Sequence, residues 1–255
     1  MRKYIYFTSN EKIKKLLSQF DLNEGELYHY TTLESAKAIK TNRELWLTRA
    51  DCTLDPSEIQ YGIDILISSA KRTLSKEELE KFIELLNIIG PKLKKSYLFC
   101  LTENKNSNRH IDTHGNTLMT FQYDFPELLL SSGRLFNHIN TKERAVTFIK
   151  DSFCLIEGKV IYDFDRQNRI ADSICNFYKA ALVNNMHIVE INLFTDVLLQ
   201  FIILLKEQCY SWENEYRICI VKTENHTNFD IEAPSEKIVN KVHFATIEFD
   251  EIYYA

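Results

Sequence analysis

The sequence predicts a single α+β domain with helical insertions. Of its 255 residues, 45% are hydrophobic and 26% are charged, which is enough apolar material for one large core. Segments with strand-like and helix-like spacing of apolar residues alternate along the chain, and no internal repeat appears. The chain has 6 Gly and 4 Pro, so no linker-rich stretch divides it. We therefore expect one domain over 1–255, with a helical preface at 1–25 and a helical insertion at 57–95.

The first part of the chain is expected to alternate short helices and strands. Apolar residues within 1–25 recur at helical spacing. The aromatic-rich segment 27–30 predicts a strand. The Thr-Thr-Leu-Glu sequence at 31–34 is typical of a capping box that opens a helix. Segment 45–48 predicts a second strand, and the Asp-Pro pair within 51–58 predicts a turn.

Two helices and two strands are expected next. Segment 57–89 has helical spacing twice over, and the Gly-Pro pair at 90–91 predicts its end. Segment 96–101 reads as a short buried strand, and 117–123 alternates as a strand does. The polar stretch between them, 102–115, is expected to be irregular.

The remaining part mixes apolar segments of both kinds, and 126–139 fits neither. The other expected elements are strands at 160–164, 187–192, 216–222 and 242–249 and helices at 165–185 and 197–205. The helix at 197–205 is far shorter than the ~20 apolar residues of a membrane span.

Composition limits the classes of function. The chain carries 31 basic and 36 acidic side chains, a net charge of −5, which argues against coating nucleic acid, although a local basic cleft stays possible. The six cysteines include no C-x-x-C pair, as expected for reduced thiols. The first residues do not read as a signal peptide. We therefore expect a cytoplasmic protein without a membrane partner.

Motifs for familiar phosphate loops and for the G-x-S-x-G hydrolase turn are missing from the sequence. The motifs that stand out are LYHYT from 27, LWLT from 45, DPSE from 55, FCLTE from 99 and WENEYR from 212. Together they resemble a bacterial family of uncharacterised domains with LYHYT, LWLT, DPSE, FSE and ExEWR motifs. The similarity covers roughly 25–60, 96–125 and 208–222.

That family is in turn remotely similar to ADP-ribosyltransferases of the His–Tyr–Glu kind. The resemblance implies a split, mostly antiparallel sheet and NAD as a substrate. It also implies transfer of ADP-ribose to a macromolecular acceptor, either protein or nucleic acid, by a toxin or phage-defence effector. A toxin would need a neutralising partner protein.

The resemblance assigns catalysis to Glu215, with Glu213 beside it. Cleavage of the nicotinamide–ribose bond passes through an oxocarbenium-like state, which a carboxylate on the ribose 2′-hydroxyl would stabilise. Glu213 shares a face with Glu215 if the segment is extended, where it could orient the nucleophile or act as its base. The alternative is a solvated strand entry with a salt bridge to Arg217, which otherwise counts among the cofactor-binding residues.

The same resemblance places NAD against the first strand. His29 would hydrogen-bond a ribose hydroxyl, the Tyr30 backbone would meet the nicotinamide amide, and Thr31 would hold the same end. Trp46 and Thr48, on a neighbouring strand, are candidate pocket walls. The alternatives are a core histidine at 29 and a core tryptophan at 46.

The stretch 106–115 departs from the family pattern. Ile111 stands where Trp is usual, and His114 stands where a Tyr would stack on nicotinamide. An imidazole can still stack, so His114 is the candidate, with Tyr123 or Tyr30 as substitutes.

A metal site is a rival interpretation of the same stretch. His110, Asp112 and His114 share one face on a strand, whereas on a helix only the two histidines do. No further ligand is identifiable in the sequence, so we expect a solvated loop and no metal.

The transferase interpretation makes a geometric demand. His29 and Glu215, 186 positions apart (215 − 29), must line one cleft and point into it. If they point to opposite faces of the sheet, or lie too far apart for one dinucleotide, the transferase interpretation fails and a non-catalytic nucleotide- or partner-binding module takes its place. An NAD glycohydrolase, with water as the acceptor, is a further alternative.

Overall fold

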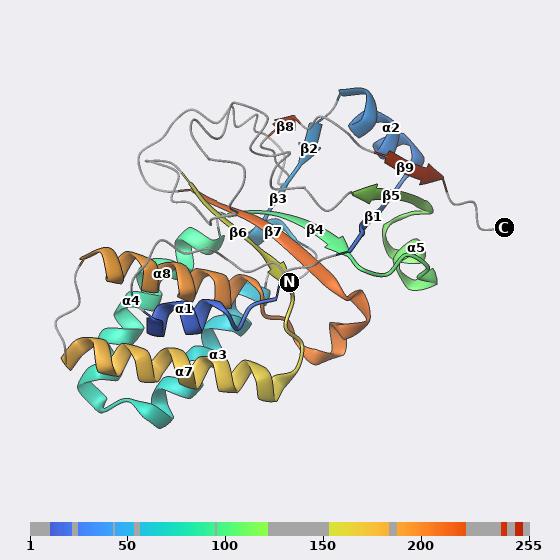
Figure 1. Ribbon diagram of the computed structural model, residues 1–255. Coiled ribbons are helices and arrows are strands. Elements are labelled where there is room, and N and C mark those ends of the chain that lie inside the picture. Colours follow the sequence, from blue (N-terminus) through green and yellow to red (C-terminus); the bar gives the residue numbers. More distant parts are fainter. Residues whose placement is uncertain are drawn as a thin grey trace.

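The computed structural model shows a central sheet with a layer of helices against one face (Figure 1). It describes residues 11–21, 25–42, 44–53, 57–94, 96–121, 153–183, 188–222, 241–243 and 248–251. The expected segment 126–139 and Tyr123 lie outside these ranges.

The sheet is antiparallel throughout its described pairs. Its strand order is β6 (Phe153–Lys159), β7 (Glu215–Lys222), β4 (Tyr97–Thr102), β1 (Leu27–Thr31), β5 (Thr117–Phe121) and β9 (Glu248–Glu251), with β3 (Thr48–Arg49) pairing β4 beside this path. A separate two-stranded sheet joins β2 (Glu44–Trp46) to β8 (Lys241–His243). The predicted α+β class with an antiparallel sheet is thus confirmed.

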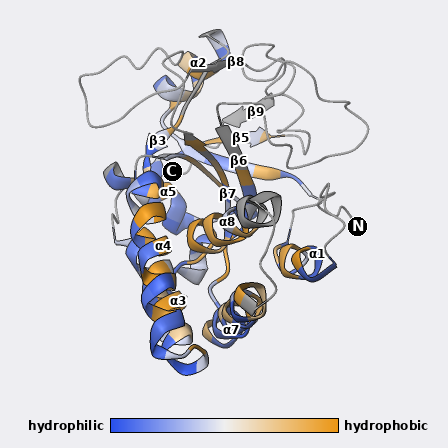
Figure 2. Ribbon diagram, turned by 90° about the vertical axis from the view of Figure 1, so that its left-hand side faces the viewer, coloured by the Kyte–Doolittle hydropathy of each residue, from blue (hydrophilic) through white to orange (hydrophobic). Residues whose placement is uncertain are grey.

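Five helices of the described ranges form the layer against one face of the sheet. They are α1 (Glu11–Leu17), α3 (Glu58–Thr73), α4 (Lys76–Lys94), α7 (Phe164–Val183) and α8 (Ile188–Ile203). Leu98, Ile156 and Cys219 project from the sheet into the same buried cluster as the apolar residues of these helices. Figure 2 shows α8 as mostly hydrophobic, between the sheet and the outer helices, whose outward sides are hydrophilic. No helix in the described ranges combines the length and the apolar character that a membrane crossing requires.

Two further helices lie at the other end of the sheet, α2 (Leu33–Asn42) and α5 (Asn108–His114), and two short 3₁₀ helices are η1 (Ala50–Cys52) and η2 (Gln208–Glu213). The helix expected to open at the 31–34 capping box begins at Leu33. Thr32 precedes it, and its hydroxyl accepts from the Ser35 backbone N–H at 3.2 Å. The predicted irregular stretch 102–115 is wrong, because it contains α5. Ser107 caps that helix by accepting from the backbone N–H of His110.

Three other expectations are also wrong. Helix α4 continues through the Gly-Pro pair at 90–91 to Lys94, because burial of Ile89 and Leu93 outweighs the hydrogen bond that proline cannot donate. Segment 187–192 lies largely in α8, and the strand expected at 160–164 is instead β6, which ends at Lys159. Short apolar runs do not distinguish strand from buried helix.

Gly115 fixes the end of α5 against β1. Its φ is +123°, and a Cβ there would collide with the carbonyl of Thr31. Gly115→Ala should therefore lower the free energy of unfolding by roughly 1–3 kcal/mol, as measured by urea denaturation. Gly90→Ala is the matched control, because its Cβ would meet only the tip of Ile63 at 3.2 Å and alanine favours a helix. Equal losses in the two variants would contradict this role of Gly115.

Candidate functional site

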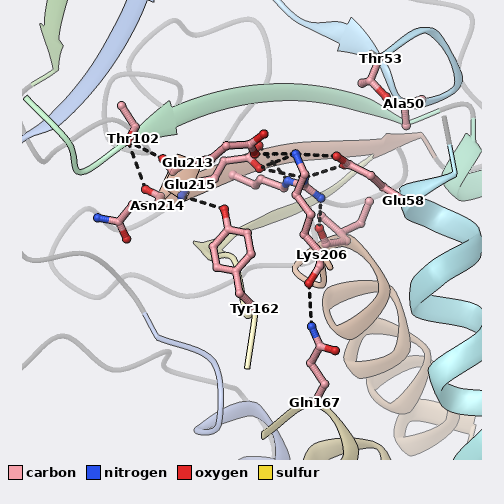
Figure 3. Close-up of polar contacts among 12 residues, drawn as sticks. Ala50, Thr53, Glu58, Thr102, Tyr162, Gln167, Lys206, Glu213, Asn214 and Glu215 are labelled. Carbon is pink, nitrogen blue, oxygen red and sulfur yellow. Dashed lines mark hydrogen bonds and ion pairs between the residues drawn. The ribbon is translucent and has the colours of Figure 1, made fainter. Parts of the chain in front are cut away.

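A buried group of charges joins the start of β7 to α3 and to the end of α8 (Figure 3). Arg217 is 1% exposed. Its Nε and Nη2 donate to the two oxygens of Glu215 at 3.0 and 2.9 Å, and Nη2 also donates to Glu58 at 2.6 Å. Lys206 Nζ pairs with Glu58 at 2.7 Å and with Glu213 at 2.6 Å. We call these five residues the ion cluster.

The helix ends explain why the cluster forms there. Glu58 is the first residue of α3, where a helix dipole favours negative charge. Arg217 Nη1 donates to the Ile203 carbonyl at 2.8 Å, at the end of α8, where the dipole favours positive charge. Lys206 follows that helix, and its carbonyl accepts from Gln167 Nε2 at 2.8 Å. The cluster is therefore anchored to the helical layer as well as to the sheet.

The cluster pushes the pKa values of its two candidate catalytic carboxyls in opposite directions. Burial alone would raise the pKa of Glu215, but Arg217 and Lys206 outweigh it and lower that pKa to about 2. Burial raises the pKa of Glu213 above its ordinary value, although Lys206 opposes the shift. Neighbouring carboxyls with divergent pKa values are the arrangement in which one stays ionised while the other handles a proton.

Asn214, which lies between Glu213 and Glu215 in the sequence, has a strained backbone conformation. Asn214 has φ 42° and ψ 52°, in the left-handed region, which non-glycine residues seldom adopt. Thr102 Oγ1 donates to the Glu213 carbonyl at 2.6 Å, and the Glu215 N–H donates to the Tyr162 hydroxyl at 3.1 Å. Glu213 ends η2 and is not extended, so the expected strand-like alternation with Glu215 is wrong. Lys206 nevertheless brings both carboxylates to one cation.

His29 lies in β1 and reaches the edge of β4. Its Nδ1 is 3.2 Å from the Cys100 carbonyl oxygen, and its ring lies 4.8 Å from that of Phe99. Burial lowers the pKa of His29 to about 4, so the ring is neutral at pH 7. Because a carbonyl only accepts, Nδ1 carries the proton and Nε2 is left as an acceptor.

The requirement that His29 and Glu215 point to one face is not met, so this prediction is wrong and the outcome counts in favour of the binding module. Tyr28 pairs with Thr102, and Thr102 pairs with Glu215, so these three side chains share a face. His29, the next residue after Tyr28, therefore projects to the other face of β1.

The two residues are nevertheless close to each other. Among the described residues, β1 and β4 pair at one position, Tyr28 opposite Thr102, and β1 leaves β4 beyond it. Cys100 meets both groups, with its carbonyl on His29 and its thiol interacting with Glu215. The separation is therefore within the reach of one dinucleotide.

His114 ends α5 and is exposed. Burial lowers its pKa, and the charges of Glu215 and Lys206 act on it in opposite directions. Its own charge helps to lower the pKa of His29. This imidazole is therefore within electrostatic range of both His29 and Glu215.

The rival metal interpretation gains no support. Within the described ranges no group of three potential ligands is placed to hold a metal ion. On α5, His110 and His114 share a face without Asp112. His110 is occupied elsewhere: its Nδ1 lies 2.7 Å from Ser107 Oγ, and its ring stacks on Tyr30 at 5.1 Å.

The other residues predicted to bind the cofactor are Tyr30, Trp46 and Thr48, and the structure gives each of them other surroundings than the resemblance implies. The Tyr30 ring is buried and stacked, and its hydroxyl donates to the Lys105 carbonyl at 2.6 Å, so it offers no open stacking surface. Trp46 belongs to the separate sheet, opposite Lys241, and is not on a strand beside β1. Thr48 pairs with Leu98, at the far end of β4 from Thr102.

Arg217 in β7 and Thr31 in β1 are the remaining residues predicted to bind the cofactor. The guanidinium of Arg217 is committed to the ion cluster and is not available to a cofactor. Thr31 is half-buried at the end of β1, where its carbonyl faces Gly115.

Sequence reasoning missed several residues of the site. Glu58 is the last residue of the DPSE motif, and its charge was the feature that could have indicated a role in the site. Lys206 directly follows the most apolar segment of the chain, and a charge in that place often needs a buried partner. Cys100 stood in the FCLTE motif, but the motif did not indicate its role, and Tyr162 had no signal. The contacts of both residues with Glu215 depend on the sheet.

The half-buried His29 makes stability depend on pH. The pKa of His29 falls from 6.5 to about 4 on folding, so between these values the unfolded chain binds more protons than the folded one. Stability should therefore fall as pH drops from 6.5 to 4. His29→Gln, which keeps a donor for the Cys100 carbonyl, should flatten this part of the profile in urea titrations. Identical profiles for both proteins would contradict the assignment.

No protein-family model matches the chain, and no curated protein or solved structure matches it either.

Proposed function

We propose that the chain binds NAD between His29 and the ion cluster, cleaves its nicotinamide–ribose bond and passes ADP-ribose to a macromolecular acceptor. The single cleft expected from the resemblance is absent from the described residues, and the proposal rests on a different geometry. Lys206 brings the carboxylates of Glu215 and Glu213 to one cation. Cys100 connects this pair to His29, because its carbonyl oxygen lies 3.2 Å from His29 Nδ1 and its thiol interacts with Glu215. The opposed pKa directions of the two carboxyls, Glu215 lowered and Glu213 raised, support the proposal. The motif resemblance supports the same activity and leaves protein and nucleic acid open as acceptors.

Each group has a defined task in this reaction. The bond from ribose C1′ to nicotinamide breaks, and its electron pair neutralises the pyridinium nitrogen, so the leaving group needs no proton. Glu215, ionised at neutral pH, stabilises the positive charge that develops on the ribose. The acceptor then bonds to C1′, and its proton passes to Glu213. Nε2 of His29 accepts a hydrogen bond from a ribose hydroxyl.

A second candidate is an NAD-binding module without catalysis. The opposite faces of His29 and Glu215 favour it, because a dinucleotide would have to pass through the gap where β1 leaves β4 to touch both. A missing tyrosine at 114 favours it too, since an imidazole offers a smaller stacking surface.

Release of free nicotinamide from NAD separates these functions. We expect release in proportion to protein concentration, and labelled ADP-ribose bound to an added protein or RNA acceptor. Release without any labelled acceptor would indicate an NAD glycohydrolase. Binding without release would indicate the module, and neither binding nor release would overturn the proposal.

In the cell, we propose, this activity serves a cytoplasmic toxin or phage-defence effector. A neutralising partner protein would protect the host from loss of NAD.

A further inference from the structure

An exposed arginine stacks on an aromatic ring next to the candidate catalytic carboxyls. The guanidinium carbon of Arg109, on α5, lies 3.9 Å from the ring centre of Trp212. Trp212 immediately precedes Glu213 at the end of η2. Because Arg109 is exposed, the face of its planar guanidinium that points away from the indole is open to a second ring. The stack therefore offers a flat, positively charged platform beside Glu213.

A second exposed cation lies in the loop between β4 and α5. Lys105 Nζ is 5.7 Å from the ring centre of Tyr28. Tyr30 holds this loop in place, because its hydroxyl donates to the Lys105 carbonyl at 2.6 Å and accepts from the Ser107 N–H at 3.1 Å. The backbone that carries Lys105 is therefore fixed before a ligand binds, which lowers the entropic cost of binding.

The positive charge of this surface is not neutralised by the carboxylates around it. Within the part of the chain that the structure describes, neither Arg109 nor Lys105 forms an ion pair with a carboxylate. Glu103, at the start of the same loop, is held by Lys159 at 2.7 Å, and Glu213 belongs to the ion cluster. A chain of net charge −5 thus has a local positive surface, which is complementary to an anionic ligand.

Single-stranded nucleic acid combines the two features that this surface fits. Its phosphates are attracted to lysine and arginine side chains, and its unpaired bases stack on aromatic rings and on guanidinium planes. A duplex keeps its bases inside the helix, where they cannot stack on a protein side chain. An acidic protein segment supplies carboxylates, but a flat ring beside each charge is a property of a nucleotide.

We propose that Arg109 and Lys105 bind a single-stranded nucleic acid, and that this strand is the acceptor of ADP-ribose. The ligand class rests on the stacked cations, whereas its role as the acceptor rests on the proposed function. In that reaction a hydroxyl or amino group of the strand bonds to C1′ as the bond to nicotinamide breaks, and nicotinamide keeps the electron pair. The proton that the strand loses passes to Glu213, the residue next to Trp212.

Fluorescence anisotropy tests the surface without relying on turnover. The probes are a short fluorescein-labelled RNA, the single-stranded DNA of the same sequence and the corresponding DNA duplex. Single strands should bind roughly tenfold more tightly than the duplex, because only unpaired bases stack on Arg109. The tighter of the two single strands identifies the sugar of the acceptor. A duplex that binds as tightly as the single strands, or single strands that do not bind at low salt, would overturn the proposal.

The outcomes distinguish this inference from the proposed function. Binding of single strands without nicotinamide release would disprove the enzyme and keep the surface. Nicotinamide release with transfer of ADP-ribose to protein, and no binding of single strands, would disprove the surface and keep the enzyme. ADP-ribose on the bound strand would support both.

Variants of the two cations give a second readout. Arg109→Lys keeps the charge but removes the plane, so it should raise the dissociation constant for single strands by roughly tenfold, or about 1.4 kcal/mol. Lys105→Gln should reduce the logarithmic salt slope by roughly 0.7, the value of one phosphate contact. Arg169→Gln, which changes an exposed cation on α7, is the matched control and should bind as the wild type does. Unchanged affinity in Arg109→Lys would contradict a base stacked on this guanidinium.

Discussion

Replacing Arg217 by methionine is expected to lower the free energy of unfolding by roughly 3–5 kcal/mol, the usual cost of removing one partner from a buried ion pair. Methionine fills much of the same volume, so the loss arises from the charges left behind. Glu58 and Glu215, 8% and 7% exposed, would lose their shared guanidinium. The Ile203 carbonyl would lose its donor at the end of α8.

An exposed pair provides the control for this prediction. Arg72 pairs with Asp172 at 2.9 Å, but both side chains are more than two-fifths exposed. Arg72→Met should therefore cost less than about 1 kcal/mol. Both variants are measured by urea denaturation at pH 7. Similar small losses in the two would show that the ion cluster is not a stabilising feature of the fold.

The change with the largest effect on activity is Glu215→Gln. Loss of a positioned electrostatic group typically lowers the rate by about 10²–10³-fold, and we expect nicotinamide release to fall by that factor with little change in affinity for NAD. Because Glu215 belongs to the buried ion cluster, the variant should also lose stability. Assays must therefore be run at a temperature where circular dichroism shows the variant to be folded.

Glu77→Gln is the control, because Glu77 is an exposed residue of α4 paired with Lys81. It should release nicotinamide at the wild-type rate. A folded Glu215→Gln variant with undiminished release would remove Glu215 from the mechanism.

Local patterns account for the parts of the fold that were predicted correctly. Segments such as 27–30 and 216–222 are rich in aromatic and β-branched residues, and both form strands of the central sheet. The start of α8 was mistaken for a strand, since Ile188 and Val189 favour β-structure locally and helix packing overrides that preference. Helix α5 was missed because its polar sequence resembles a loop and its Ser107 cap was overlooked.

The site was predicted less completely for a physical reason. Glu215 could be chosen by its motif, but its pKa is lowered by Arg217 and Lys206. Arg217 is in turn held by Glu58, which is 159 positions distant from it. Whether His29 and Glu215 share a face depends on strand register, which a single sequence does not reveal. Trp46 was misplaced because its strand pairs with β8, near the other end of the chain.

The central claim is that one NAD molecule contacts both His29 and Glu215. The most direct test is a crystal structure of the wild-type protein with an NAD analogue whose nicotinamide ribose carries a methylene in place of the ring oxygen, so that the oxocarbenium-like state cannot form. The account predicts a ribose hydroxyl within hydrogen-bonding distance of Glu215 and another within that distance of His29 Nε2. An analogue bound elsewhere, or with its nicotinamide end away from Glu215, would contradict it.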